Sequence, residues 1–273
     1  MAIANPAGAG LRFDVNCSIL FTELPLLERP AAAKAAGFDA VEFWWPFDRA
    51  VPSDREVDAF VRTIDDAGVA LVGLNFAAGN MPAGDRGLLS DPSHTAEFTD
   101  GVDIAVDIAR RTGCRALNAL YGNRVEGCSP AEQDELAVEN LTLAARAAEP
   151  AGAVVLLEAL NAKENPRYPL RTAADVARVI DVLPAGNVRF LADFYHLAIS
   201  GEAAAEVVAA HHELIGHVQI ADVPGRNQPG TGGFDFDELF GALGAHGYSG
   251  WVGLEYRPTE ASIDSFDWLN DGP

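Results

Sequence analysis

Short apolar runs alternate with longer amphipathic segments along the chain. The runs are six or seven residues long and rich in Val, Leu, Ile and aromatic residues, which is typical of buried strands. They lie at 11–16, 40–45, 69–75, 115–120, 154–160, 188–194, 215–221 and 251–256. The pattern predicts eight strands, each followed by a helical segment.

Two of the helical segments carry clear end signals. The segment 129–152 opens with Ser129 as an N-cap and Pro130 at the first helical position, with acidic residues in its first turn. The segment 98–113 ends on Gly113, which is typical of a helix C-terminus. Both segments are therefore predicted to be helices on the outside of a sheet.

Eight strand–helix units within one chain of this length predict a single (β/α)8 TIM barrel in the α/β class. We expect the catalytic barrel over residues 11–258, a flexible tail at 1–10 and a C-terminal extension at 259–273. The alternative is a doubly wound open sheet, but it usually has fewer strands and a GxGxxG turn, which this sequence lacks.

Polar side chains end four consecutive predicted strands. These are Glu158, Asp193, Gln219 and Glu255, with His196 close behind Asp193. Catalytic groups of such barrels sit at the carboxyl ends of the strands, so we expect these side chains to converge. Buried acids that converge repel one another, and a bound divalent cation would relieve that repulsion. An oxygen-rich donor set favours Mg²⁺ or Mn²⁺ over zinc.

Other polar residues near these strands are interpreted as structural. Strand alternation puts Asp222 on the face opposite Gln219. His217 shares the face of Gln219 but lies one layer deeper, which favours a core histidine. His211 and His212 follow a helical pattern and are expected to be solvated.

The net charge of the chain limits the classes of partner that we expect. Forty acidic residues against 19 basic ones give a formal net charge of −21, which disfavours nucleic acid as a partner. The three cysteines show no CxxC spacing and are expected to be reduced thiols of a cytoplasmic protein. We find no apolar stretch long enough for a membrane helix. A homo-oligomer is compatible with the sequence but not identified by it.

Seven sequence blocks, in order along residues 11–258, resemble the hydroxypyruvate isomerase family of xylose-isomerase-like barrels. They are NCSILF (16–21), VEFWWPFD (41–48), NFAAGNMPAGDRG (75–87), LLEALN (156–161), ADFYH (192–196), QIADVPGRNQPGTG (219–232) and GWVGLEYRP (250–258). The most specific are the QIAD…PGTG block and the terminal GWVGLEY, since the fold and its acidic ligands are shared by sugar epimerases and inosose dehydratases.

The resemblance implies a role for each matched residue. Glu158 and Glu255 would be the acid/base pair and would also contact the metal, with Asp193 and Gln219 completing its ligands. His196, Arg226 and Asn75 would contact a small-molecule hydroxy-carbonyl acid. Arg226 is the first candidate for binding the substrate carboxylate, with Arg86 and Lys163 next. Ala159 and Lys163 depart from the family pattern after the first glutamate, which bears on the contacts of that loop.

The implied reaction interconverts hydroxypyruvate and tartronate semialdehyde, a step of glyoxylate metabolism. A proton leaves C3, an enediolate forms, and a proton arrives at C2. Trp44, Trp45 and Phe21 either wall the pocket or pack in the core. The alternatives are isomerisation of a 2-oxo-tetronate, 3-epimerisation of a ketose, and an inosose dehydratase-like loss of water. A DNA-repair endonuclease of the same fold would need a histidine-rich zinc site and a basic face.

Overall fold

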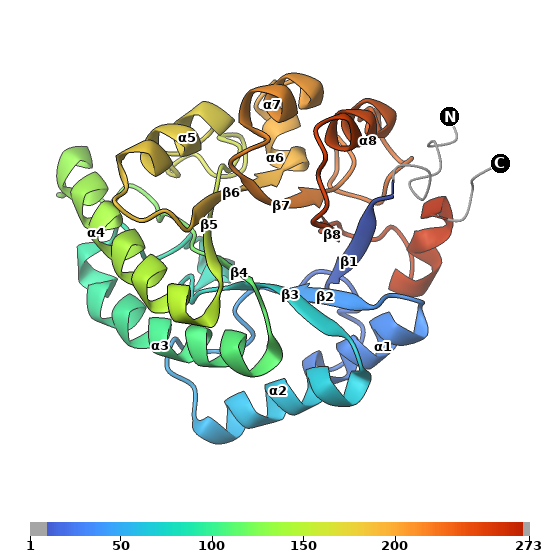
Figure 1. Cartoon of the computed structure of the whole chain (residues 1–273), viewed down its shortest axis with the longest axis horizontal. Helices are drawn as coiled ribbons and strands as arrows, with labels where there is room; N and C mark the ends of the chain where they lie inside the picture. The colour runs from blue at the N-terminus through green and yellow to red at the C-terminus, as the bar shows by residue number, and fades with distance from the viewer. Residues whose placement is uncertain (1–9, 270–273) are drawn as a thin grey trace.

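Each of the eight apolar runs forms one strand of a closed parallel barrel, in which neighbours along the chain are neighbours in space (Figure 1). The computed structural model describes residues 10–269. The strands are Arg12–Asn16 (β1), Ala40–Phe43 (β2), Ala70–Asn75 (β3), Ala116–Asn118 (β4), Val154–Glu158 (β5), Val188–Asp193 (β6), Ile215–Ile220 (β7) and Trp251–Leu254 (β8). The predicted (β/α)8 barrel is confirmed.

Amphipathic helices cover the outside of the barrel and bury their apolar faces against the strands (Figure 1). The α-helices are Arg29–Ala35 (α1), Asp54–Ala67 (α2), Thr95–Thr112 (α3), Pro130–Ala148 (α4), Ala173–Val182 (α5), Phe194–Ile199 (α6), Ala204–His211 (α7) and Phe236–Ala245 (α8). Short 3-10 helices are Leu26–Glu28 (η2), Met81–Ala83 (η3), Pro92–His94 (η4), Glu149–Ala151 (η5) and Ser262–Leu269 (η6). The two predicted end signals are confirmed: Ser129 caps α4 in a capping box with Glu132, and Gly113 ends α3 in the left-handed conformation.

The interior of the barrel has an apolar side and a polar side. Ala116, Leu156 and Leu191 form a small apolar cluster inside β4–β6. On the opposite side, β1, β2 and β7 bring together the buried side chains of Asp14, Glu42 and His217. Polar groups therefore continue from the carboxyl ends of the strands down into one half of the barrel.

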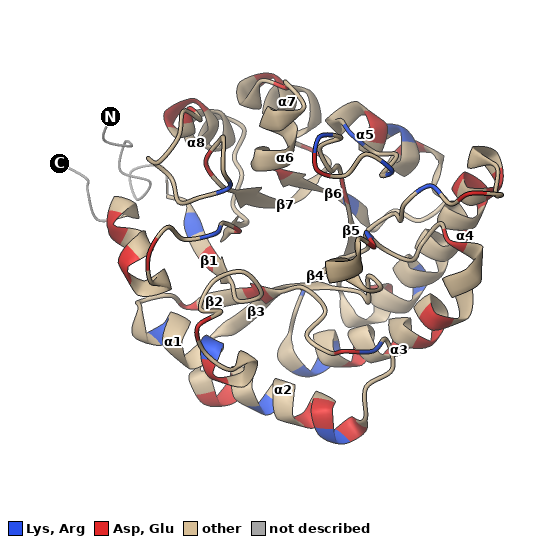
Figure 2. Ribbon diagram, turned by 180° about the vertical axis from the view of Figure 1, so that it is seen from behind, with Lys and Arg blue, Asp and Glu red and all other residues tan. Residues whose placement is uncertain are grey.

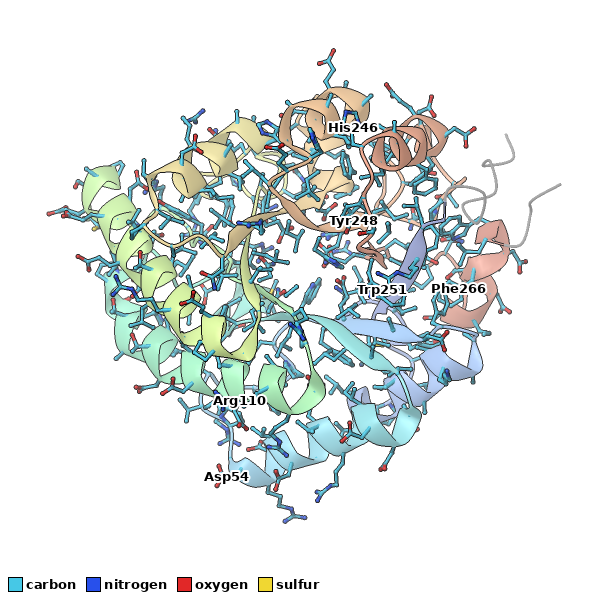
Figure 3. The ribbon with its side chains drawn as sticks, viewed as in Figure 1. Asp54, Arg110, His246, Tyr248, Trp251 and Phe266 are labelled. Atoms are coloured by element: carbon cyan, nitrogen blue, oxygen red, sulfur yellow. The ribbon has the colours of Figure 1, made fainter. Side chains whose placement is uncertain are left out.

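The chain after β8 packs back onto the barrel. Phe266 of η6, labelled at the edge of the barrel in Figure 3, lies with its ring centroid 4.8 Å from that of Phe38. Trp268 meets Phe13 of β1 edge-on, with centroids 5.7 Å apart. The η6 segment thus covers β1 between α8 and α1 (Figure 1). It takes the place of the α-helix that would follow β8 in a regular barrel. The expected tail at 1–10 lies outside the described residues except for Gly10.

Acidic residues are spread around the outer helices and loops rather than gathered on one side (Figure 2). Within residues 10–269, none of the helices combines the length and the apolar character that crossing a membrane would require.

Candidate active site

The four polar residues predicted at the ends of β5–β8 are buried at the same end of the barrel. Glu158, Asp193, Gln219 and Glu255 are each 5% exposed or less. Parallel pairing aligns Asp193 with Gln219, and Gln219 with Gly253, two residues before Glu255. Ligand atoms of Glu158, Asp193 and His196 lie within 4.8 Å of one another. Two acidic side chains from neighbouring strands and one histidine therefore share one small volume.

Glu255 is held from both of its carboxylate oxygens. Oε1 accepts hydrogen bonds from Trp44 Nε1 at 2.6 Å and from Asn16 Nδ2 at 3.1 Å. Oε2 accepts from Nη2 of Arg226, which also lies 3.3 Å from Oδ2 of Asp193. The carboxylate of Glu255 is thus fixed in position before any ligand arrives.

Burial and mutual repulsion make this site unfavourable for negative charge. Burial raises the pKa of Glu158 well above its usual range, and the charges of Glu255 and Asp193 raise it further. The pKa of Asp193 is also raised, first by burial and then by Glu255, although Arg226 opposes this. A positive charge brought among these groups would stabilise their ionised forms.

Gln219 provides an independent test of whether these residues fit a metal. Its Oε1 atom is buried and has no hydrogen-bond partner among residues 10–269. An unpaired buried carbonyl oxygen costs free energy, and a cation is one group that would satisfy it. Carboxylate and amide oxygens together suit a hard divalent cation. The residues present therefore fit a divalent metal, and Glu158, Asp193, Gln219 and Glu255 are the candidates to hold it.

His196 lies beside this site, but its hydrogen bonds favour a different role from that of a ligand. Its Nδ1 accepts from the backbone N–H of Asn161 at 3.3 Å, so the proton of the neutral ring is on Nε2. Burial lowers the pKa of His196 well below its usual range, and Arg226 and Arg86 add to this. A neutral ring with its N–H on the Asp193 side, 3.6 Å from Oδ2, can donate to a substrate oxygen.

A cavity of about 490 Å³ opens over these residues. Its wall includes Glu158, His196, Glu255, Trp44, Asn75, Arg86, Arg226 and Arg257. Arg86 is oriented by Asn165, whose Oδ1 accepts from Nε at 2.6 Å. Lys163 is exposed and is not part of this wall. The structure therefore brings Asn75, Arg86, Arg226 and His196 to the cavity and leaves Lys163 outside it.

The residues interpreted as structural have structural contacts. Asp222 accepts from the backbone N–H groups of Val223, Gly230, Gly232 and Phe234, and so shapes the loop after β7. His217 is buried and bonded to Glu42. Of the three aromatic residues, Trp44 lines the cavity, whereas Trp45 packs half-buried against the core. Phe21 belongs to the core, and its ring is tilted against that of Phe266.

Four polar residues of the site are not among those predicted from the sequence: Asn16, Glu42, Asn118 and Arg257. Asn118 donates from Nδ2 to Oε2 of Glu158 at 3.0 Å, and Arg257 lines the cavity. Asn16 and Asn118 are the last residues of β1 and β4. The signal that identified Glu158, a polar residue ending an apolar strand, was therefore also present in the first half of the barrel.

Comparisons with known proteins agree with this geometry. Residues 30–272 match the model of the Xylose isomerase-like TIM barrel family. The chain is 57% identical to a "Putative hydroxypyruvate isomerase" of Streptomyces coelicolor, with 97% of each chain covered. It is 32% identical to the hydroxypyruvate isomerase of Escherichia coli, covering 95% of this chain and 98% of the relative.

Two further similar proteins carry names other than hydroxypyruvate isomerase. A 2-oxo-tetronate isomerase of Haemophilus influenzae is 31% identical, over 94% of this chain and 98% of the relative. A crystal structure titled AP endonuclease, family 2, from Brucella melitensis superposes with a TM-score of 0.88 at 33% identity, covering 95% of this chain and 98% of that chain. The resemblance inferred from the sequence blocks is confirmed over nearly the whole chain.

Proposed function

This chain belongs to the Xylose isomerase-like TIM barrel family, and we propose that it interconverts hydroxypyruvate and tartronate semialdehyde. The observation that carries the proposal is a cavity lined by Glu158, Glu255, Arg86 and Arg226, with ligand atoms of Asp193 within 4.8 Å of those of Glu158. Acid–base groups beside cations suit a substrate that carries both an exchangeable C–H bond and a carboxylate.

A divalent cation held by these four residues, Mg²⁺ or Mn²⁺, would supply positive charge for the adjacent oxygens of an enediolate. Glu158 and Glu255 stand on β5 and β8, with β6 and β7 between them. In the proposed reaction one glutamate removes the proton from C3 and the other delivers a proton to C2.

Neighbouring side chains would orient the substrate. Arg226 and Arg86 are the candidate partners of the substrate carboxylate, because both guanidinium groups line the cavity. His196 would donate its Nε2–H to a substrate oxygen. Asn75 and Trp44 complete the wall on the β2–β3 side.

A 2-oxo-tetronate is the second candidate substrate. The cavity of about 490 Å³ leaves room for an acid one carbon longer than hydroxypyruvate. The chemistry at the reacting carbons would be the same, so the two candidates differ only in the space and polar contacts at the far end of the substrate.

A substrate comparison in D₂O tests the proposal. Protein that has been treated with a chelator and reloaded with Mg²⁺ or Mn²⁺ is incubated with hydroxypyruvate, a 2-oxo-tetronate and an uncharged ketose, and the products are followed by NMR. We expect reversible isomerisation of an acid with deuterium at the carbon that receives the proton. Turnover of the ketose alone, or irreversible loss of water, would rule out the proposed reaction.

A further inference from the structure

Glu42 is a buried carboxylate at the end of β2 that bonds to a candidate metal ligand. Its Oε1 accepts from Nε2 of Gln219 at 2.7 Å and from Nδ2 of Asn16 at 2.9 Å. Its Oε2 lies 2.6 Å from Nε2 of His217. Glu42 is 3% exposed and, from β2, contacts Gln219 of β7, which lies 177 positions later in the chain.

The barrel leaves room for this carboxylate by placing glycine on two other strands. A Cβ atom at Gly253 of β8 would lie 2.8 Å from Oε1 of Glu42, and one at Gly73 of β3 would lie 3.1 Å from its Cβ. The β2–β3 register also shifts between Val41 and Glu42. Any larger residue at Gly253 would press on the carboxylate, so its position depends on these neighbours.

The contact with Glu42 decides which way the Gln219 amide points. An ionised carboxylate only accepts hydrogen bonds, so the NH₂ group of Gln219 must face Glu42 and its carbonyl oxygen must face away. That oxygen is the buried Oε1 with no partner among the described residues. In the flipped amide, Oε1 would face the carboxylate oxygen of Glu42, which has no proton to donate to it.

We propose that Glu42 is a positioning residue that holds Gln219 with its carbonyl oxygen directed at the metal. The inference rests on the metal site of the proposed function. Metal ligands are commonly fixed by a carboxylate behind them, and loss of that partner typically weakens metal binding about 10–100-fold. Asn16 Nδ2 donates to both Glu42 and Glu255, but Glu255 is also held by Trp44 and Arg226, so its position does not depend on Glu42.

Metal affinity of three variants tests this role. Mn²⁺ binding is measured by calorimetry and by electron paramagnetic resonance for wild type, Glu42→Gln, Gln219→Leu and the double variant. We expect Glu42→Gln to weaken Mn²⁺ binding about 10–100-fold, because the NH₂ group gained in this variant can donate to the carbonyl oxygen of a flipped Gln219. The double variant should bind like Gln219→Leu, within about twofold, because Glu42 acts through Gln219. Glu202→Gln, a half-buried carboxylate outside the cavity, is the control for loss of one charge.

A second variant separates position from charge. Glu42→Asp keeps the negative charge but shortens its reach, so the proposal predicts weaker Mn²⁺ binding there as well, even if Glu42→Gln does not fold. Wild-type Mn²⁺ affinity in a folded Glu42→Asp variant would overturn the proposal in favour of charge alone. So would a loss of Mn²⁺ affinity from Glu42→Gln that is equally large in the wild-type and Gln219→Leu backgrounds. If the wild type itself binds no divalent metal, the metal site of the proposed function fails instead.

Discussion

Arg226 and Glu255 form an ion pair in the middle of the candidate active site. Nη2 of Arg226 donates to Oε2 of Glu255, and Nε donates to the Glu255 backbone carbonyl at 3.3 Å. The backbone of Arg226 has a φ of 58°, in the left-handed region, and is tied to Asp222 and Arg257 by hydrogen bonds. The loop after β7 thus holds the guanidinium group of Arg226 against Glu255 and Asp193, two of the carboxylates proposed to bind a metal.

The guanidinium group of Arg226 also lines the cavity, so it is expected to contribute to binding of the substrate carboxylate. A charge-assisted hydrogen bond is worth about 1.5–3 kcal/mol, so Arg226→Ala should raise KM for hydroxypyruvate about 10–150-fold. KM for an uncharged ketose should rise much less. Steady-state kinetics on both substrates provide the measurement, and Lys163→Ala is the matched control because Lys163 lies outside the cavity. Equal losses on acid and ketose would show that Arg226 is structural.

Metal binding should stabilise the folded protein. A metal at about 100 times its Kd adds about 2.7 kcal/mol, which corresponds to an increase in Tm of several degrees for a domain of this size. Differential scanning calorimetry after chelation and after adding Mn²⁺ measures this shift. Asp193→Asn should reduce it, because it removes one of the anionic donors. The same Tm increase in the variant would place the ion elsewhere.

The sequence predicted the second half of the site better than the first. Glu158, Asp193 and Glu255 were identifiable because each is a charge closing an apolar run, and parallel strands end at one mouth. Glu42 is also a charge in an apolar run, but Phe43, Trp44 and Trp45 follow it, so the pattern predicts only a buried strand there. Sequence alone also could not show that Arg226 pairs with the acids, since that depends on the left-handed backbone conformation of Arg226 in its loop.

The C-terminal segment shows the same limit for the fold. Residues 259–273 have no apolar run of strand length, so the sequence predicts only that they form a C-terminal extension of the barrel. Nevertheless, Trp268 packs against Phe13 of β1, and Phe266 packs against Phe38, which lies between α1 and β2. Which surface such aromatic residues cover depends on the gap left between α8 and α1, and that gap exists only in the closed barrel.

The capping box of α2 predicts a contribution of Glu56 to acid stability. Hydrogen bonds from the Ser53 side chain and backbone, with Arg49, lower the pKa of Glu56 to about 2. Its stabilising contribution is therefore present above the unfolded-state pKa and is lost as pH falls toward 2. The Tm difference between wild type and Glu56→Gln should shrink from pH 5 to pH 3. A difference that is constant over this range would contradict it.

The two glutamates provide the most direct test of the mechanism. If Glu158 and Glu255 transfer the proton, Glu→Gln at either position should lower kcat at least about 10²–10⁴-fold, since the amide keeps the shape but cannot act as a base. Residues that act as a unit are not additive, so the double variant should be little slower than the slower single variant. Rapid-quench turnover assays, with calorimetry to verify bound metal, measure this.

Glu164→Gln is the matched comparison for these variants. Glu164 is a carboxylate at the wall of the same cavity, but it accepts from Tyr195 and Asn161 rather than facing the buried acids. Its loss should therefore alter KM more than kcat. Near wild-type kcat in Glu158→Gln or Glu255→Gln with metal bound would mean that another group moves the proton, and His196 would then be the first residue to replace, because its Nε2 lies 3.6 Å from Asp193.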